Sequence, residues 1–132
     1  GNEFGATSGR PRRCGWFDAV IARYAVRING IDNLAITKLD VLDRFERIKV
    51  CTGYKYGDKI LREFPTDPMI LESCEPVYEE HPGWLEPTTD VRSWDDLPKI
   101  ARDYLSFLEE ITGAPAKIVS VGSKRSQTIF RD

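Results

Sequence analysis

Two stretches of this chain repeat an apolar residue at steps of three and four. Each stretch ends in a glycine and leads into a short apolar run. The first covers residues 16–30 and the second covers residues 97–113, glycine included. This spacing is that of one face of an α-helix, and glycine favours the left-handed turn that ends a helix. The runs that follow, at 34–36 and 117–121, are typical of strands. Alternating helices and strands predict an α/β fold.

A further strand is predicted over residues 48–56, where β-forming side chains alternate. The order helix, strand, strand, helix, strand then predicts part of a mixed, mostly parallel sheet with flanking helices. Prolines interrupt residues 65–87 and favour loop there, apart from one extended piece at 76–78. Ser93 is expected to cap the second helix, with Pro98 in its first turn.

The composition bounds the class of protein. The chain has 132 residues, is 41% hydrophobic and 30% charged, and carries a formal net charge of -2. These values predict one globular domain and argue against a general affinity for nucleic acid. No apolar run is long enough to span a bilayer. The chain opens on Gly1-Asn2-Glu3-Phe4, without an initiator Met or a signal peptide, so we expect a piece of a larger protein.

Cysteine and histidine are too sparse to predict a metal centre. Cys14, Cys51 and Cys74 are far apart, which favours a reducing compartment over a disulfide framework or a zinc site. His81 is the single histidine and precedes Pro82-Gly83, a turn pair, so a loop position is expected for it.

Residues 5–16 combine a small, glycine-flanked, hydroxyl-bearing segment with three arginines, Arg10, Arg12 and Arg13. Glycine lets a backbone approach a ligand closely, and the arginine fork matches phosphate or carboxylate. The segment therefore suits an anion site. The alternative is a solvated basic loop, and this run does not decide between the two.

Thr37-Lys38-Leu39-Asp40 follows the predicted strand at 34–36 and resembles the guanine-selecting tetrad of GTP-binding proteins, Asn-Lys-x-Asp. Guanine presents N1–H and the N2 amino group side by side, and one carboxylate accepts both. Adenine lacks that pair of donors. The Lys38 stem can lie along the base. Ser120-Val121-Gly122 follows the last predicted strand and can offer backbone groups to the edge of a base. Taken singly, the first segment is better explained as a charged strand end and the second as an ordinary tight turn.

Together the loop at 5–16, the tetrad at 37–40 and the turn at 120–122 resemble adenylosuccinate synthetase in order and spacing. The resemblance covers nearly the whole chain. It includes Gln127-Thr128-Ile129 and the segments 50–54 and 75–78. It implies that this chain is the C-terminal piece of a larger P-loop-like, GTP-dependent ligase domain. Within residues 1–132 it implies a substrate loop at 5–16 and guanine-recognition elements at 37–40 and 120–122.

The resemblance also implies a reaction. The family couples IMP to L-aspartate, using GTP as co-substrate with Mg²⁺. GTP phosphorylates O6 of IMP, and the aspartate amino group then displaces the phosphate. The resemblance further implies a cytoplasmic homodimer with no nucleic-acid or membrane partner. The family's phosphate loop, catalytic groups and Mg²⁺ ligands lie N-terminal to the matching segment, so no catalytic or metal-binding residue is assigned here and the isolated chain is expected to be inactive.

Binding roles carry over by matching motif. The loop that would bind aspartate and IMP consists of Ala6, Thr7, Ser8, Gly9, Arg10, Pro11 and Arg12, with Arg10 also reaching IMP. The residues that would bind GTP are Arg12, Lys38, Leu39, Asp40, Ser120, Val121 and Gly122. Ser8 replaces a family threonine and keeps its hydroxyl. Residues 121–124 depart from the family's Gly-Pro pattern.

A competing hypothesis is a stand-alone phosphate-binding or interaction module that uses the cluster from Arg10 to Arg13. Such a module would have no use for Lys38-Leu39-Asp40. It should show no preference among bases, and its binding should weaken steeply with salt.

Overall fold

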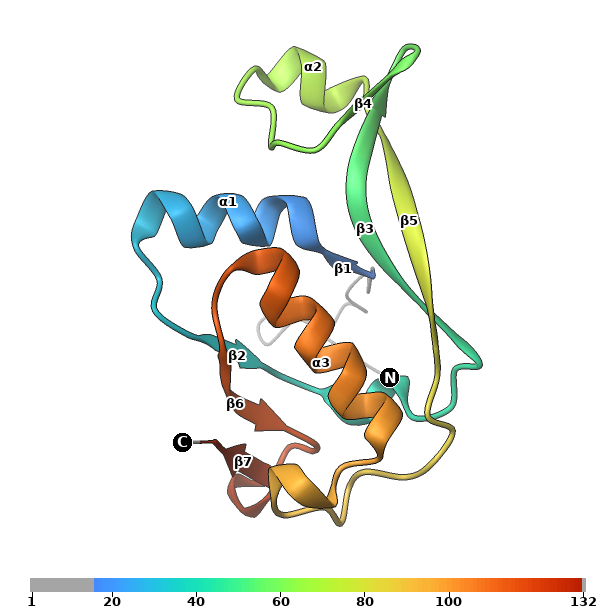
Figure 1. Ribbon diagram of the computed structural model, residues 1–132, viewed down its shortest axis with the longest axis vertical. Helices are drawn as coiled ribbons and strands as arrows, with labels where there is room; N and C mark the ends of the chain where they lie inside the picture. Colours follow the sequence, from blue (N-terminus) through green and yellow to red (C-terminus); the bar gives the residue numbers. More distant parts are fainter. Residues whose placement is uncertain (1–15, 132) are drawn as a thin grey trace, which may run out of the picture.

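The computed structural model describes residues 16–131 (Figure 1). The α-helices are α1 (Ala19–Asn29), α2 (Pro68–Glu72) and α3 (Lys99–Thr112). Short 3-10 helices are η1 (Leu39–Leu42), η2 (Trp94–Asp96) and η3 (Arg125–Gln127). The strands are β1 (Phe17–Asp18), β2 (Leu34–Ile36), β3 (Arg47–Tyr56), β4 (Lys59–Leu61), β5 (Glu75–Pro82), β6 (Ala116–Ser120) and β7 (Thr128–Phe130).

These strands form two mixed sheets. In the first, β3 pairs with β1 in parallel and with β4 and β5 in antiparallel fashion. In the second, β6 lies between β2, which is parallel to it, and β7, which is antiparallel. The predicted α/β class with mixed pairing is confirmed. The antiparallel share is larger than the sequence indicated, because short connections fold β4 back on β3 and β7 back on β6. Figure 1 shows β3 and β5 as a long ribbon with α2 near its far end.

Helix α1 begins where Asp18 caps it. The Asp18 carboxylate accepts hydrogen bonds from the N–H groups of Val20 and Ile21 at 3.0 and 3.1 Å. Its other oxygen accepts from the Tyr54 hydroxyl at 2.5 Å, which ties the start of α1 to β3. The helix ends at Gly30, whose φ of 61° is left-handed, as the sequence predicted. The start differs from the expectation, since residues 16–18 precede the helix and 17–18 pair with β3.

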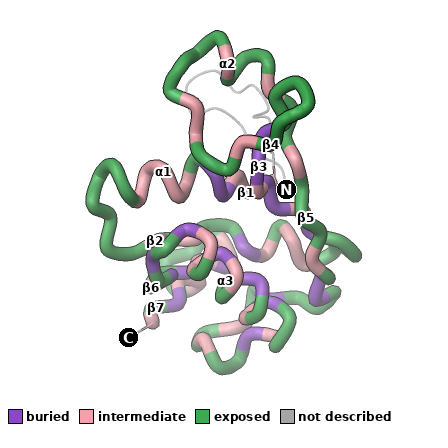
Figure 2. Tube along the Cα trace, turned by 45° about the horizontal axis from the view of Figure 1, so that its top comes forward, coloured by how far each residue is buried: buried purple, intermediate pink, exposed green. Residues whose placement is uncertain are grey.

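The main core lies beneath α3. Ala101, Tyr104, Leu105 and Leu108 on its inner face are buried against strand residues such as Val119 (Figure 2). Gly113, with φ 83°, ends the helix as predicted. The start that the sequence predicted for this helix is wrong. Pro98 directly precedes α3 instead of lying in its first turn, and Ser93 precedes η2, where its hydroxyl donates to Asp96 at 2.8 Å.

The stretch 65–87 contains more regular structure than its prolines indicated. Asp67 caps α2 with Pro68 at the helix start, a position that needs no N–H donor. The extended piece expected at 76–78 is confirmed, and it belongs to the longer strand β5. The expected loop position of His81 is wrong: His81 lies in β5, opposite Ile48 of β3. Strand β7 was not predicted at all.

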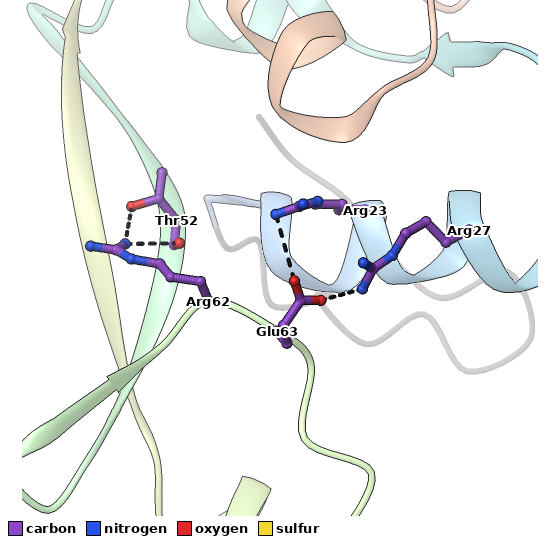
Figure 3. Close-up of polar contacts among 5 residues, drawn as sticks. All are labelled: Arg23, Arg27, Thr52, Arg62 and Glu63. Carbon is purple, nitrogen blue, oxygen red and sulfur yellow. Dashed lines mark hydrogen bonds and ion pairs between the residues drawn. The ribbon is translucent and has the colours of Figure 1, made fainter.

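A polar cluster joins the ribbon to α1 (Figure 3). Glu63, which follows β4, forms ion pairs with Arg23 at 3.9 Å and with Arg27. Next to it, Arg62 Nη1 donates to the carbonyl and the hydroxyl of Thr52 at 3.0 and 3.3 Å. Both Arg23 and Arg27 are therefore partnered within the described chain. None of the helices within residues 16–131 is both long and apolar enough to cross a membrane.

Candidate functional site

Two turns meet at the carboxyl ends of the neighbouring parallel strands β2 and β6. Residues 37–40, here called the β2 turn, follow Ile36, which is paired with Val119. Residues 120–122, here called the β6 turn, follow Val119 on the adjacent strand. The Lys38 N–H donates to the Ser120 hydroxyl oxygen at 3.0 Å, so one hydrogen bond connects the turns directly. Carboxyl ends of parallel strands are where open α/β sheets place ligands.

The β2 turn has a constrained backbone. Lys38 has φ 60° and ψ 40°, a left-handed conformation that is uncommon for a residue with a side chain. Within residues 16–131 only Leu85 shares this property among the residues other than glycine. Such conformations persist where the surroundings hold them, and they concentrate at binding sites. Here the hydrogen bond from the Lys38 N–H to Ser120 provides that support.

Leu39 and Asp40 begin the 3-10 helix η1 in opposite environments. The Leu39 side chain is only 1% exposed and anchors the turn in the core, so it can offer a ligand only its backbone. The Asp40 Oδ1 atom is shielded from solvent and has no hydrogen-bond partner within the described chain. Burial raises the pKa of the Asp40 carboxyl above its ordinary value of 3.8, and the nearby negative charge of Asp43 raises it further. A buried carboxylate oxygen without a donor is costly, and a ligand that brings N–H groups would remove that cost.

Asp43, three residues further along, has hydrogen-bond donors for both of its carboxylate oxygens. Its carboxylate accepts from Trp84 Nε1 at 2.7 Å and from the Thr88 N–H at 2.8 Å. The Thr88 hydroxyl lies 2.8 and 3.0 Å from its two oxygens. Asp43 therefore has a structural role, whereas one oxygen of the Asp40 carboxylate has no donor within residues 16–131.

The β6 turn is closed by Gln127. The Val121 N–H donates to the Gln127 carbonyl at 2.8 Å, and the Val121 side chain is fully buried. The Gln127 side-chain oxygen accepts from the Lys124 N–H at 3.0 Å. A Cβ on Gly122 would lie 2.2 Å from that oxygen, so any side chain at this position would displace the Gln127 amide. Both Val121 and Gly122 can thus offer a ligand only backbone groups.

The structure brings together Lys38, Leu39, Asp40, Ser120, Val121 and Gly122, to which the sequence analysis gave guanine recognition, and that role remains a prediction. Ala6, Thr7, Ser8, Gly9, Arg10, Pro11 and Arg12 lie outside the described residues, and so do Arg13 and Cys14. Their roles remain predictions. Sequence reasoning assigned no role to Asp43, Thr88 or Gln127. The aspartate three positions after the tetrad and the glutamine after the last turn were visible, but the partners that connect them, Trp84, Thr88 and Thr89, are distant in sequence.

Within residues 16–131 no group of three His, Cys, Asp or Glu side chains is arranged to hold a metal ion. The Mg²⁺ ligands that the family resemblance implies are expected N-terminal to the matching segment, and that expectation stays a prediction.

Comparisons with known proteins agree on one family. The family model for adenylosuccinate synthetase matches residues 1–129. The chain is 60% identical to the adenylosuccinate synthetase of Geotalea daltonii over 130 residues, which are 98% of this chain and 30% of that protein. It is 58% identical to that of Carboxydothermus hydrogenoformans, covering 100% of this chain and 31% of the relative.

A solved structure described as fully ligated adenylosuccinate synthetase from Plasmodium falciparum superposes with a TM-score of 0.91 at 36% identity. It covers 98% of this chain and 32% of that one. The chain thus spans about a third of the length of the relatives that it matches.

Proposed function

Because the chain belongs to the adenylosuccinate synthetase family of purine-biosynthesis ligases, we propose that it supplies the guanine-recognition part of such an enzyme. The complete enzyme would join IMP to L-aspartate at the expense of GTP. In the proposed reaction O6 of IMP takes the γ-phosphoryl group, which converts a carbonyl oxygen into a leaving group. The aspartate amino group then attacks C6 and phosphate departs, leaving adenylosuccinate, GDP and phosphate.

One observation carries this proposal: the Asp40 oxygen that is buried without a donor among residues 16–131, on a turn that Ser120 connects to the neighbouring strand end. Guanine offers two parallel N–H donors that a carboxylate can accept, and adenine would leave that carboxylate unpaired. The Lys38 stem would cover one face of the base, and backbone groups of residues 120–122 would meet its other edge.

The remaining substrates would be bound by the loop at residues 5–16. Thr7 and Ser8 would contact the aspartate carboxylates, and Arg10 would reach both aspartate and IMP. Arg12 would lie between the aspartate and GTP sites. Guanidinium groups suit these anions because they bind carboxylate and phosphate in bidentate fashion. Mg²⁺ would be held by the part of the relatives that this chain does not span.

The proposal is tested by calorimetry of the chain with GDP and ADP. We expect GDP to bind more tightly, and we expect Asp40→Asn to abolish the preference. Asp32→Asn, on an exposed loop residue, is the matched control and should leave the preference intact. Equal binding of the two nucleotides, with an affinity that falls steeply as salt increases, would instead favour a phosphate-binding module based on Arg10 to Arg13.

A second test uses a hybrid enzyme, defined as the Geotalea daltonii synthetase with its matching segment replaced by residues 1–132. Adenylosuccinate formation by the hybrid enzyme should require GTP and should not be supported by ATP. Equal rates with the two nucleotides would contradict guanine recognition by this segment.

A further inference from the structure

We propose that Asp43 and Gln127 are positioning residues for base recognition, connected to each other through residues 83–92, here called the brace loop. The inference rests on the proposed function. It concerns residues that touch neither the base nor the reacting atoms, and it explains how the β2 turn and the β6 turn keep a fixed separation.

The first end of the brace loop is fixed on the segment that follows the β2 turn. Asp43 accepts hydrogen bonds from Trp84 and Thr88 at 2.7–3.0 Å, and these two side chains are 4% and 0% exposed. The Gly83 N–H donates to the Glu46 carbonyl at 2.9 Å. A Cβ at Gly83 would overlap the Phe45 carbonyl oxygen at 1.6 Å, so glycine allows this close approach. The end of η1 therefore cannot shift without the brace loop.

The second end of the brace loop is fixed on the β6 turn. Gln127 Nε2 donates to the Thr89 carbonyl at 3.2 Å, while its Oε1 accepts from the Lys124 N–H. The amide thus spans from the brace loop to the loop between β6 and β7. A Cβ built on Gly122 would lie 2.2 Å from the oxygen of this amide, so the amide lies beside the β6 turn.

These contacts close a ring. It runs from the β2 turn through Asp43, Thr88 and Thr89 to Gln127 and the β6 turn, and it returns through the bond from the Lys38 N–H to Ser120. The pairing of β2 with β6 and the bond from the Lys38 N–H to Ser120 hold the two turns where they leave the strands. A second connection on another path also fixes their relative angle. A base that is read by both turns at once needs that angle to be held closely.

The test uses the hybrid enzyme with Gln127→Met, which keeps the length of the side chain and removes both hydrogen bonds. We expect the KM for GTP to rise about fivefold, the factor that corresponds to loss of one ordinary hydrogen bond. The kcat and the KM values for IMP and aspartate should stay within about twofold of the reference, because the brace acts only on base recognition. Ser126→Ala, on the adjacent exposed residue, is the control.

A second variant, Asp43→Asn, tests the other end of the ring. Its amide group would face a donor where the carboxylate now accepts, so we expect the same selective rise in the KM for GTP. In either variant, an unchanged KM for GTP would overturn the inference. So would a fall in kcat with every KM unchanged, or a common rise in all three KM values, since those results describe a general structural defect.

The unsubstituted hybrid enzyme separates the two claims. If it prefers GTP over ATP and the variants keep the reference KM for GTP, the positioning role of Asp43 and Gln127 is overturned while guanine recognition by this segment stands. If it does not distinguish the nucleotides, guanine recognition by this segment fails and the brace fails with it.

Discussion

Asp40 and Asp43 lie three positions apart on one short turn, and the fold gives them opposite surroundings. Asp43 accepts from Trp84 and Thr88, whereas one oxygen of Asp40 is buried without a donor in the described chain. The first arrangement stabilises the turn. The second costs free energy in the absence of a ligand, which is the usual sign that a side chain is kept for binding and not for stability.

The raised pKa of Asp40 predicts a pH dependence. Burial, its largest cause, penalises the charged form, so this carboxyl lowers the stability of the folded chain at neutral pH and restores it as the pH falls through the raised pKa. Guanine needs the charged form as its acceptor. The affinity of the chain for GDP, measured by calorimetry over the acidic range, should therefore fall at a higher pH than an ordinary aspartate would give. Asp40→Asn should show no such transition at this position; a wild-type affinity that is flat over the same range would contradict the role of Asp40.

Gly122 gives a prediction about coupling. Gly122→Ala would place a Cβ 2.2 Å from the Gln127 side-chain oxygen and displace that side chain. In the hybrid enzyme this change should raise the KM for GTP about as much as Gln127→Ala does. The double variant should be no worse than either single variant, because the clash acts by displacing the same Gln127 side chain that makes the brace contacts. Additive effects on the KM would show that Gly122 is needed for another reason.

At the scale of the elements, Asp18 and Glu63 each connect α1 with the ribbon formed by β3 and β5, and the two side chains differ in burial. Asp18 is partly buried and accepts from two helix N–H groups and from Tyr54. Burial and that bond to Asp18 raise the pKa of the Tyr54 hydroxyl. Glu63 pairs with two arginines, but its side chain is 59% exposed. Exposed ion pairs contribute little to stability.

Asp18→Ala should therefore lower the free energy of unfolding by about 1–2 kcal/mol through the lost helix cap. It should lower it further because the Tyr54 hydroxyl loses its partner. Glu63→Gln is the comparison and should change the free energy by less than about 1 kcal/mol. Urea unfolding of the isolated variants measures both, and an equal loss for the two would contradict this ranking.

Local sequence patterns predicted the elements that carry the site, but they did not predict the strand pairing and side-chain hydrogen bonds between segments that are distant in sequence. The two main helices follow from the periodicity of their apolar residues, and their ends follow from Gly30 and Gly113. Strand β5 was hidden by Pro76 and Pro82, which are tolerated because β5 pairs only with β3 within the described sheet. Asp67-Pro68 was a readable start signal for α2 that was overlooked. The partners of Gln127 and Asp43 in the brace loop lie 38–45 residues away in sequence, so no local pattern could identify them.

At the scale of the whole molecule, the chain is about a third of the length of its relatives. The proposed function assigns base recognition to residues 37–40 and 120–122, and it assigns phosphoryl transfer to the part of the relatives outside the match.

The isolated chain should therefore form no adenylosuccinate when it is incubated with GTP, IMP, aspartate and Mg²⁺. The hybrid enzyme under the same conditions should form it, because it adds the segment that this chain does not span. Product formation by the isolated chain, followed by chromatography, would contradict the assignment.

The most direct test of guanine recognition exchanges one donor for one acceptor on the base. Xanthine carries a carbonyl oxygen where guanine carries the N2 amino group, and an asparagine amide can donate to that oxygen while accepting from N1–H. In the hybrid enzyme we measure the KM for GTP and for XTP with Asp40 and with Asp40→Asn. The account predicts a lower KM for GTP with Asp40 and a lower KM for XTP with Asp40→Asn. A preference that is the same in both proteins would contradict the placement of Asp40 against the base.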